Sequence, residues 1–295
     1  MSGAVVGGDV QKTVLITGCS SGIGRATARA FNDEGWTVYA TARNPADIQT
    51  LGEEGCELAT LDVTEQDDVD RVVDRILDEE GAIDCLVNNA GYGQFGPIED
   101  VPVEKVHDQF DVNVYGPHRL TRAVLPHMRR ERDGTIINLS SVAGRVSFPT
   151  GGVYCGSKFA LEAMSDALRA EVDEYGIDVV LVEPGPVKTD FSARARDEVV
   201  TDDEDGETTD DGGLDRSGAY EAFYDIFEDT EAIGGGGVGA VEPERVAEEV
   251  LNAASSTKPN ARYQPGLAAR IGVLGRFVPD WLRDKGFATI RKFTS

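Results

Sequence analysis

Short apolar runs alternate with amphipathic helical stretches over the first 185 residues, and this alternation limits the possible folds more than any other feature of the chain. The runs are partly β-branched and are bounded by Gly, Pro or polar residues, as buried strands are. Repeated strand–helix units of this length predict an α/β fold, with a doubly wound parallel sheet and helices on both of its faces. The predicted strands are residues 13–17, 37–41, 58–61, 83–88, 135–140 and 177–185.

The pattern changes beyond residue 190. Residues 197–215 hold ten acids and no base, and a run of four glycines follows at 234–237. We predict an acidic substrate flap over 190–240, inserted into a single domain of residues 12–295 that follows a loose tail at 1–11. Four aromatic residues in the flap share one helix face, and either a pocket wall or simple packing would explain them. They are Tyr220, Phe223, Tyr224 and Phe227.

The C-terminal part returns to a helical pattern in "PERVAEEVLNAASS" after residue 242. The stretch "RYQPG" at 262–266 predicts one further strand at an edge of the sheet. The tail "VPDWLRDKGFATIRKF" predicts a helix with a basic end.

The net charge of −25, from 53 acids and 28 bases, predicts no nucleic-acid partner and no anionic membrane partner. Self-repulsion of this size becomes tolerable when salt shortens the screening length to about 3 Å near 1 M. We therefore predict a halophilic protein. No apolar run reaches the roughly 18 residues of a membrane span, and the first residues lack signal-peptide features, so a cytoplasmic location is expected.

Cysteine and histidine spacing gives no sign of a metal site. The four cysteines form no CxxC pair and fit no zinc pattern, which predicts reduced thiols. The three histidines are eleven and nine residues apart, and we expect surface or core roles for them and no metal. These residues are Cys19, Cys56, Cys85, Cys155, His107, His118 and His127.

A glycine-rich turn joins the first predicted strand to the first helix. The stretch "VLITGCSSGIGRATA" places Gly18, Gly22 and Gly24 there. Glycines let the backbone approach a pyrophosphate, and the helix N-terminus offers free N–H groups and a partial positive charge. The turn therefore predicts a dinucleotide site in a Rossmann-type sheet.

The end of the second predicted strand bears on which dinucleotide binds. NAD sites usually carry an acid there for the ribose 2′-hydroxyl, whereas this chain reads "ATARNP" with Arg43. A guanidinium suits a 2′-phosphate through charge-assisted hydrogen bonds. The sequence favours NADP(H), with NAD(H) still possible, and a solvated surface role for Arg43 stays open.

A tyrosine and a lysine lie four residues apart in "VYCGSKFA". Gly18, Asn89 and Ser141 each follow a predicted strand, and the carboxyl ends of parallel strands meet at one edge of a sheet. Lys158 is one helical turn beyond Tyr154. A nearby ammonium should lower the phenol pKa from about 10, which would make Tyr154 a general acid or base.

Together these motifs resemble the short-chain dehydrogenase/reductase family over residues 12 to 190. The sequence of these motifs is most similar to that of the subgroup of 17-beta-hydroxysteroid and retinol dehydrogenases. The resemblance implies an NADP(H)-dependent oxidoreductase that interconverts a ketone or aldehyde and an alcohol by hydride transfer. The matching motifs are TGxxxGIG at 17–24, Asp62, NNAG at 88–91, Asn113, Ser141, YxxxK at 154–158 and PG at 184–185.

The resemblance also implies roles for single residues. Tyr154 would transfer the proton, Ser141 would hydrogen-bond the reacting oxygen, and Lys158 would hold the nicotinamide ribose. Asn113 would hold a water that links Lys158 to solvent. Homodimers or homotetramers would be expected. The implied cofactor contacts are Gly18, Ser20, Ser21, Gly22, Ile23, Gly24, Arg43, Asp62, Val63, Asn89, Ala90, Gly91, Tyr154, Lys158, Pro184, Gly185, Val187 and Thr189.

Apolar residues just after the catalytic motifs suggest a lipophilic substrate; they are Tyr92, Phe95, Val146 and Phe148. Two alternatives remain. One is a non-catalytic NADP(H)-binding sensor or regulator, against which the complete Tyr/Lys/Ser set argues. The other is an epimerase or dehydratase that keeps its cofactor, against which the glycine spacing and the missing large C-terminal domain argue.

Overall fold

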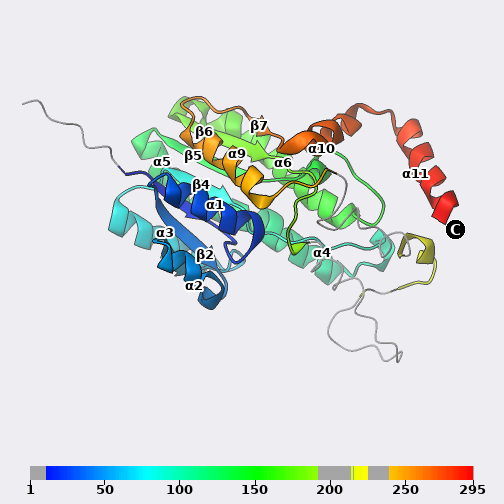
Figure 1. The fold of residues 1–295 in the computed structure, drawn as a ribbon, viewed down its shortest axis with the longest axis horizontal. Helices are drawn as coiled ribbons and strands as arrows, with labels where there is room; N and C mark the ends of the chain where they lie inside the picture. Colours follow the sequence, from blue (N-terminus) through cyan, green and yellow to red (C-terminus); the bar gives the residue numbers. More distant parts are fainter. Residues whose placement is uncertain (1–10, 192–213, 215, 225–238, 295) are drawn as a thin grey trace, which may run out of the picture.

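The computed structural model describes residues 11–191, 214, 216–224 and 239–294, and within them a seven-stranded parallel sheet forms the centre of the molecule (Figure 1). The strand order is β3-β2-β1-β4-β5-β6-β7. This confirms the predicted doubly wound α/β architecture. The strands are β1 (Thr13–Ile16), β2 (Thr37–Ala42), β3 (Glu57–Thr60), β4 (Cys85–Asn88), β5 (Gly134–Leu139), β6 (Ile177–Val182) and β7 (Arg262–Tyr263).

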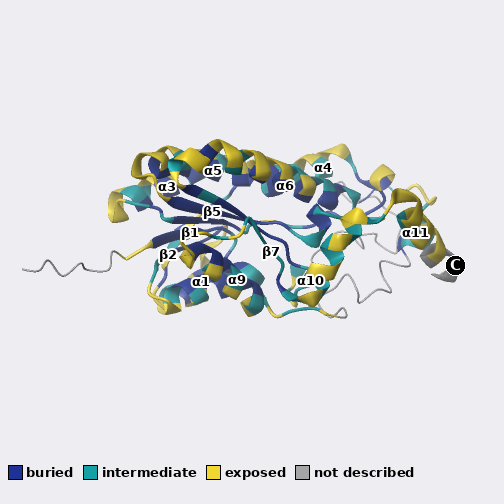
Figure 2. Cartoon of the chain, turned by 90° about the horizontal axis from the view of Figure 1, so that it is seen from above, coloured by how far each residue is buried: buried dark blue, intermediate teal, exposed yellow. Residues whose placement is uncertain are grey.

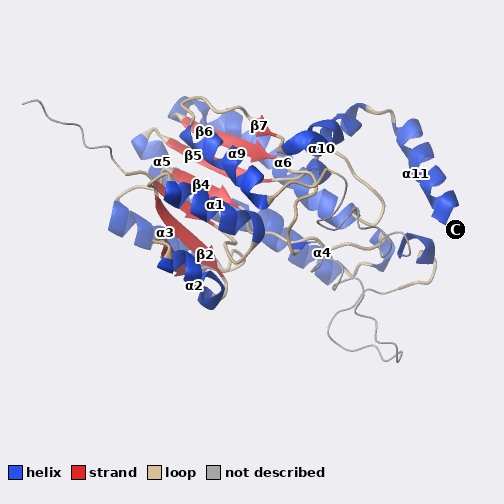
Figure 3. Ribbon diagram, viewed as in Figure 1, coloured by secondary structure: helices blue, strands red, loops and turns tan. Residues whose placement is uncertain are grey.

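Helices cover both faces of the sheet (Figures 2 and 3). The helices α1 (Gly22–Asp33) and α9 (Pro243–Ser255) lie on one face, and α3 (Gln66–Glu80), α5 (Gly116–Glu131) and α6 (Gly152–Val172) lie on the other. Side chains of β1 alternate between these layers, with Val14 and Ile16 facing α1 and Leu15 facing α3.

Shorter elements join these layers. They are α2 (Gln49–Glu53), α4 (Val103–Phe110), α10 (Gly266–Gly272), α11 (Asp280–Thr294), a π-helical turn η3 (Asp111–Tyr115) and the 3₁₀ turns η1 (Pro45–Ile48), η2 (Ile98–Asp100), η4 (Val142–Gly144), η5 (Asp173–Tyr175) and η6 (Val273–Phe277).

Helix α3 shows how local sequence sets an element. Acidic Asp67 and Asp68 occupy its first turn, where they complement the helix dipole. Its apolar stripe is buried, and the helix stops at Gly81, whose φ of 81° suits the left-handed C-terminal position.

Two strand boundaries differ from prediction by more than one residue. Strand β6 ends at Val182 rather than at residue 185, because Pro184 has no N–H to donate to a neighbouring strand. Strand β4 begins at Cys85 rather than at residue 83. The predicted edge strand is confirmed, since Arg262–Tyr263 pairs in parallel with Leu181–Val182.

Most of the predicted flap at 190–240, together with Phe227 and the tail at 1–10, lies outside the described residues. The described part packs on the turn at 95–101. Tyr224 is buried and its hydroxyl donates to Asp100 Oδ2 at 2.8 Å, while Leu214 packs against Gly96. Packing therefore accounts for Tyr224.

Two features are absent from the described residues. None of their helices is both long enough and apolar enough to cross a membrane. No cluster of His, Cys, Asp and Glu in them is placed to hold a metal ion. The four cysteines are buried as free thiols.

Candidate active site

The glycine-rich turn and the NNAG motif lie against each other at the carboxyl edge of the sheet. Asn89 Nδ2 donates to the carbonyl oxygens of Thr17 and Gly18 at 2.8 and 3.0 Å. Gly18 has φ 72°, and a Cβ added there would lie 2.8 Å from Ala90 Cα. A Cβ on Gly24 would also collide with Gly18 and Asn89. Only glycine allows this approach.

Thr17 is a site residue that the sequence analysis did not single out. Its hydroxyl accepts hydrogen bonds from the backbone N–H groups of Asn89 and Ala90, both at 3.0 Å. Thr17 could have been recognised in the sequence as the first polar residue after β1, within the TGxxxGIG motif. Thr17 fixes the two turns relative to each other.

The start of α1 borders a cavity of about 200 Å³. Gly22 and Thr189 both line it, and a Cβ on Gly22 would lie 2.9 Å from Thr189 Cγ2. The lining also includes three basic side chains, Arg25, Arg29 and Lys188, and two acidic ones, Asp190 and Glu244. A helix N-terminus suits a diphosphate. Ser21 is the N-cap residue of α1, Ile23 packs on the core, and the Ser20 carbonyl accepts from Arg25.

The ends of β2 and β3 carry the residues predicted to bind the adenosine. Arg43 follows β2 directly and is exposed; among the described residues it forms no hydrogen bond or ion pair. Asp62 Oδ1 accepts from the Thr64 backbone N–H at 2.9 Å, and Val63 is buried. The Leu61 N–H donates to Ala42 O at 3.0 Å, so the two strand ends adjoin. The structure therefore brings these residues to one place.

Tyr154 lies in the first turn of α6, and Ser141 faces it from the turn after β5. The Ser141 hydroxyl lies close enough to the phenol to lower its pKa, and Tyr154 is 8% exposed. Ser141 Oγ also accepts from the Ala143 N–H at 3.1 Å and donates to Pro184 O at 3.4 Å. These bonds fix the orientation of Ser141 toward the phenol.

Lys158 is buried one turn further along α6. Its Nζ donates to the Leu139 carbonyl oxygen at 2.8 Å and lies 5.9 Å from the centre of the Tyr154 ring. A Cβ on Gly91 would be 3.7 Å from Lys158 Nζ and 3.0 Å from Asn113 Oδ1. A side chain at Gly91 would therefore crowd the amide and lie against the lysine.

Asn113 lies in the π-helical turn η3 and is 1% exposed. Its Nδ2 donates to Tyr92 O at 2.9 Å and to Ser157 Oγ at 3.1 Å, and its Oδ1 accepts from the Tyr92 N–H at 3.2 Å. Such turns are frequent at functional sites because they redirect a side chain out of the regular helix. Here the turn directs Asn113 toward α6 and Lys158.

The pKa values differ from the expectation drawn from the sequence. Burial raises the pKa of Tyr154 to about 12, and the Ser141 hydroxyl only partly opposes this. Burial lowers the pKa of Lys158 to about 8, opposed by the Glu162 carboxylate. The predicted lowering of the phenol pKa by Lys158 is therefore wrong for this state, because loss of water outweighs a cation 5.9 Å from the ring.

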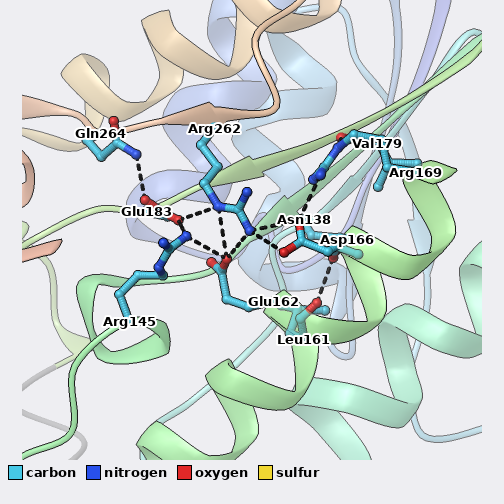
Figure 4. Close-up of polar contacts among 11 residues, drawn as sticks. Asn138, Arg145, Leu161, Glu162, Asp166, Arg169, Val179, Glu183, Arg262 and Gln264 are labelled. Atoms are coloured by element: carbon cyan, nitrogen blue, oxygen red, sulfur yellow. Dashed lines mark hydrogen bonds and ion pairs between the residues drawn. The ribbon is translucent and has the colours of Figure 1, made fainter. Parts of the chain in front are cut away.

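A buried network of charged side chains lies next to Lys158 and was not predicted from the sequence (Figure 4). Glu183 is fully buried beside Pro184. Its Oε1 forms ion pairs with Arg145 Nη1 at 3.1 Å and with Arg262 Nε at 3.0 Å. Arg262 also binds Glu162 at 3.0 Å. The network joins the Ser141 turn, α6, the end of β6 and β7. Only Glu162, four residues after Lys158, could have been picked out from spacing.

An apolar wall surrounds the Tyr154 ring. The ring centre of Phe95 is 5.4 Å away and that of Phe191 is 5.7 Å away, and Phe148 stacks on Phe95. Of the residues predicted to line a pocket, Phe95 and Phe148 thus lie at the site. Val146 lies against Gly275 of η6, and Tyr92 binds Asn113 through its backbone.

The stretch after β6 closes the site opposite Tyr154. Val187 forms a bridge with Val241, and a Cβ on Gly185 would lie 3.2 Å from the Ala269 nitrogen of α10. The structure therefore gathers the predicted residues from Gly18 to Thr189 at the carboxyl edge of one sheet.

A sequence profile described as short chain dehydrogenase matches residues 12–199. The chain belongs to this family. It is 35% identical over 278 residues to the uncharacterized oxidoreductase YbbO of Escherichia coli K12, covering 94% of each chain. It is 34% identical to bovine retinol dehydrogenase 8, covering 89% of this chain and 86% of the relative.

Solved structures agree with this assignment. A short-chain dehydrogenase from Streptomyces avermitilis matches with a TM-score of 0.78 and 31% identity, covering 98% of this chain and all of its own. A serine dehydrogenase complexed with NADP⁺ matches with a TM-score of 0.70 and 29% identity, covering 86% and 94%. This short-chain dehydrogenase is an oxidoreductase of hydroxyl and carbonyl groups.

Proposed function

We propose that this short-chain dehydrogenase is an NADP(H)-dependent enzyme that reduces a lipophilic ketone or aldehyde, with Tyr154 as the general acid. The observation that carries the proposal is the buried Tyr154 phenol, which lies beside Ser141 and has Lys158 Nζ 5.9 Å from its ring centre. A phenol with a pKa of about 12 is protonated at neutral pH, which is the form that a reduction needs.

The residues at the carboxyl edge fit a dinucleotide. Gly18 and Gly22 let the turn before α1 pack closely on Ala90 and Thr189, and the helix N-terminus that follows suits a diphosphate; both basic and acidic side chains line the cavity beside Gly22. When bound there, the nicotinamide supplies the hydride. Arg43 would hold a 2′-phosphate, because its guanidinium is exposed at the end of β2 and has no hydrogen-bond or ion-pair partner among the described residues. The serine dehydrogenase neighbour, which is complexed with NADP⁺, supports this choice.

Each catalytic residue has its own role in the proposed reduction. Ser141 and Tyr154 would hydrogen-bond the carbonyl oxygen, which polarises the bond for hydride addition at carbon. As charge develops on that oxygen, Tyr154 transfers its hydroxyl proton and an alcohol forms. Lys158, whose pKa is about 8, holds a proton near neutral pH and can help restore the phenol. Asn113 would place a water for that return.

The substrate class follows from the ring cluster around Tyr154. Phe95, Phe148 and Phe191 present apolar rings to the reacting position, which favours a lipophilic carbonyl compound. The similarity to retinol dehydrogenase 8 points the same way. We also propose, from the sequence, a cytoplasmic homodimer or homotetramer adapted to salt.

A substrate panel tests the proposal. Apolar and polar ketones and aldehydes are each incubated with NADPH or NADH, at low salt and in molar KCl, and loss of the reduced-nicotinamide absorbance is followed. We expect faster turnover with NADPH and with apolar carbonyls. Tight NADPH binding with no turnover of any carbonyl would favour the sensor alternative. Product formation without net loss of NADPH would favour an epimerase or dehydratase.

A further inference from the structure

The C-terminal segment of residues 266–289 presents large apolar side chains to solvent. Leu267, Ile271 and Leu274 are spaced by four and three residues along α10 and η6, and Phe277 and Trp281 follow on either side of the extended residue Val278. Phe277 is 77% exposed and Trp281 is 67% exposed, although both are types usually buried. The stripe is Leu267, Ile271, Leu274, Phe277 and Trp281.

The side of the same segment that faces the protein carries small residues. Ala269 is fully buried and packs against Gly185. A Cβ on Gly272 would lie 2.8 Å from Val142 Cγ1, and one on Gly275 would lie 3.1 Å from Val146 Cγ2. A surface helix of a globular protein normally has the reverse arrangement, with its large apolar side chains facing the core. Exposed apolar stripes of this kind mark an interaction surface.

The charge of the segment also differs from that of the rest of the chain. Residues 266–295 contain six bases and two acids, whereas residues 1–265 contain 22 bases and 51 acids. The bases Arg270, Arg276 and Lys285 alternate with the apolar stripe. Long basic side chains can bury their stems in an apolar layer and keep their charge at its surface. The combination is typical of segments that lie in the interface of an anionic bilayer.

We propose that residues 266–289 dock this protein on an anionic lipid surface, with the apolar stripe in the acyl boundary and the bases at the headgroups. Helix α11 extends away from the sheet (Figure 1), so docking through this segment keeps the acidic body off the surface. Charges beyond a screening length of about 8 Å at physiological salt are largely screened. A second copy of the same segment fits less well, because each copy carries six bases and two acids over residues 266–295 and the two would repel each other. A membrane partner was not expected from the sequence, where the net charge of the whole chain argued against one.

The docking segment also touches the active site. It packs on Val142 and Val146 beside Ser141, and on Gly185 after β6. A lipophilic substrate could therefore pass from the lipid layer to Tyr154. This last step rests on the proposed function; the docking itself does not.

Trp281 provides a direct probe. Trp36 and Trp281 are the two tryptophans of the chain, so Trp36→Phe leaves Trp281 as the reporter. The Trp36→Phe protein is mixed with vesicles of phosphatidylcholine alone or with added phosphatidylglycerol, and emission and flotation are measured. Circular dichroism checks that the chain is folded at the salt used. We expect a blue shift of Trp281 and flotation with the anionic vesicles.

Matched variants separate the stripe from general apolar exposure. Phe277→Ser should weaken vesicle binding about tenfold, because one large apolar side chain no longer enters the lipid. Arg270→Gln with Arg276→Gln should weaken it on anionic vesicles only. Val103→Ser, on α4 and also 77% exposed, should bind like the parent. No blue shift with any vesicle, or a shift that depends on protein concentration without lipid, would overturn the proposal. None of these readouts requires turnover.

Discussion

Lys158 Nζ lies 5.9 Å from the centre of the Tyr154 ring and gives its hydrogen bond to the Leu139 carbonyl oxygen. The group beside the phenol that lowers its pKa is instead the Ser141 hydroxyl. Burial acts on both ionisable groups and favours the neutral form of each. The site is therefore set up with a protonated phenol, which suits the donation of a proton to a carbonyl oxygen.

Ser141 should matter far more than its neighbour Ser140. Ser141→Ala removes the hydroxyl beside the phenol that is proposed to hydrogen-bond the developing alkoxide, so we expect kcat to fall about a hundredfold. Ser140→Ala changes a hydroxyl on the other side of the turn, next to Gly144, and should change kcat less than about threefold. Steady-state kinetics with one ketone gives both values, and equal losses would show that Ser141 has no special role.

Arg43 should set the preference between NADPH and NADH. Arg43→Ala removes the guanidinium proposed to bind the 2′-phosphate, and we expect kcat/KM for NADPH to fall about tenfold to a hundredfold while that for NADH stays the same. Arg122→Ala, at an exposed position on α5, is the control and should change neither value. An equal effect of Arg43→Ala on both cofactors would contradict the assignment.

Glu162 should control the protonation of Lys158. Its carboxylate opposes the lowering of the Lys158 pKa by burial, which leaves that pKa at about 8. The ammonium is present below this pH and is lost above it, so the rate of reduction should fall as pH rises through that value. Glu162→Gln removes the opposing charge, and the fall should move to lower pH by about half a unit to one unit.

Asp166→Asn is the matched control for this shift. Asp166 forms an ion pair with Arg262 at 2.7 Å in the same network, but its side chain is half exposed. The carboxylate that opposes the lowering of the Lys158 pKa by burial is that of Glu162. We expect its pH profile to match that of the parent protein. If both variants shift the profile equally, the network acts on the site only through its packing.

The acidic surface should make stability depend on salt. Mutual repulsion within a chain of net charge −25 weakens as KCl shortens the screening length from about 10 Å at 0.1 M to about 3 Å at 1 M. The melting temperature should therefore rise over this range, as followed by circular dichroism. A highest melting temperature at low KCl would refute the predicted salt adaptation.

Much of the fold was predictable because it depends on local pattern. Strand β1 alternates its side chains between two apolar layers, and α3 places its buried valines at helical spacing. The edge strand at Arg262–Tyr263 was found from two residues and a following Pro. The position of Tyr154 near Ser141 also follows from the order of strands, because parallel strands end at the same edge.

The rest depends on contacts between distant segments. The burial that raises the pKa of Tyr154 comes from Phe95 and Phe191, which are 59 and 37 residues away in sequence. Arg262 joins Glu162 and Glu183 only after β7 has paired with β6. No sequence window contains such a network, so its effect on Lys158 could not be anticipated.

The most direct test of the central claim is Tyr154→Phe, which keeps the ring and removes only the hydroxyl. We predict that kcat for ketone reduction falls about a thousandfold while the Kd for NADPH, measured by fluorescence titration, changes little. Tyr39→Phe, a buried tyrosine whose hydroxyl binds Glu79 instead, should keep near-full activity. Near-full activity of Tyr154→Phe would contradict the assignment of Tyr154 as the proton donor.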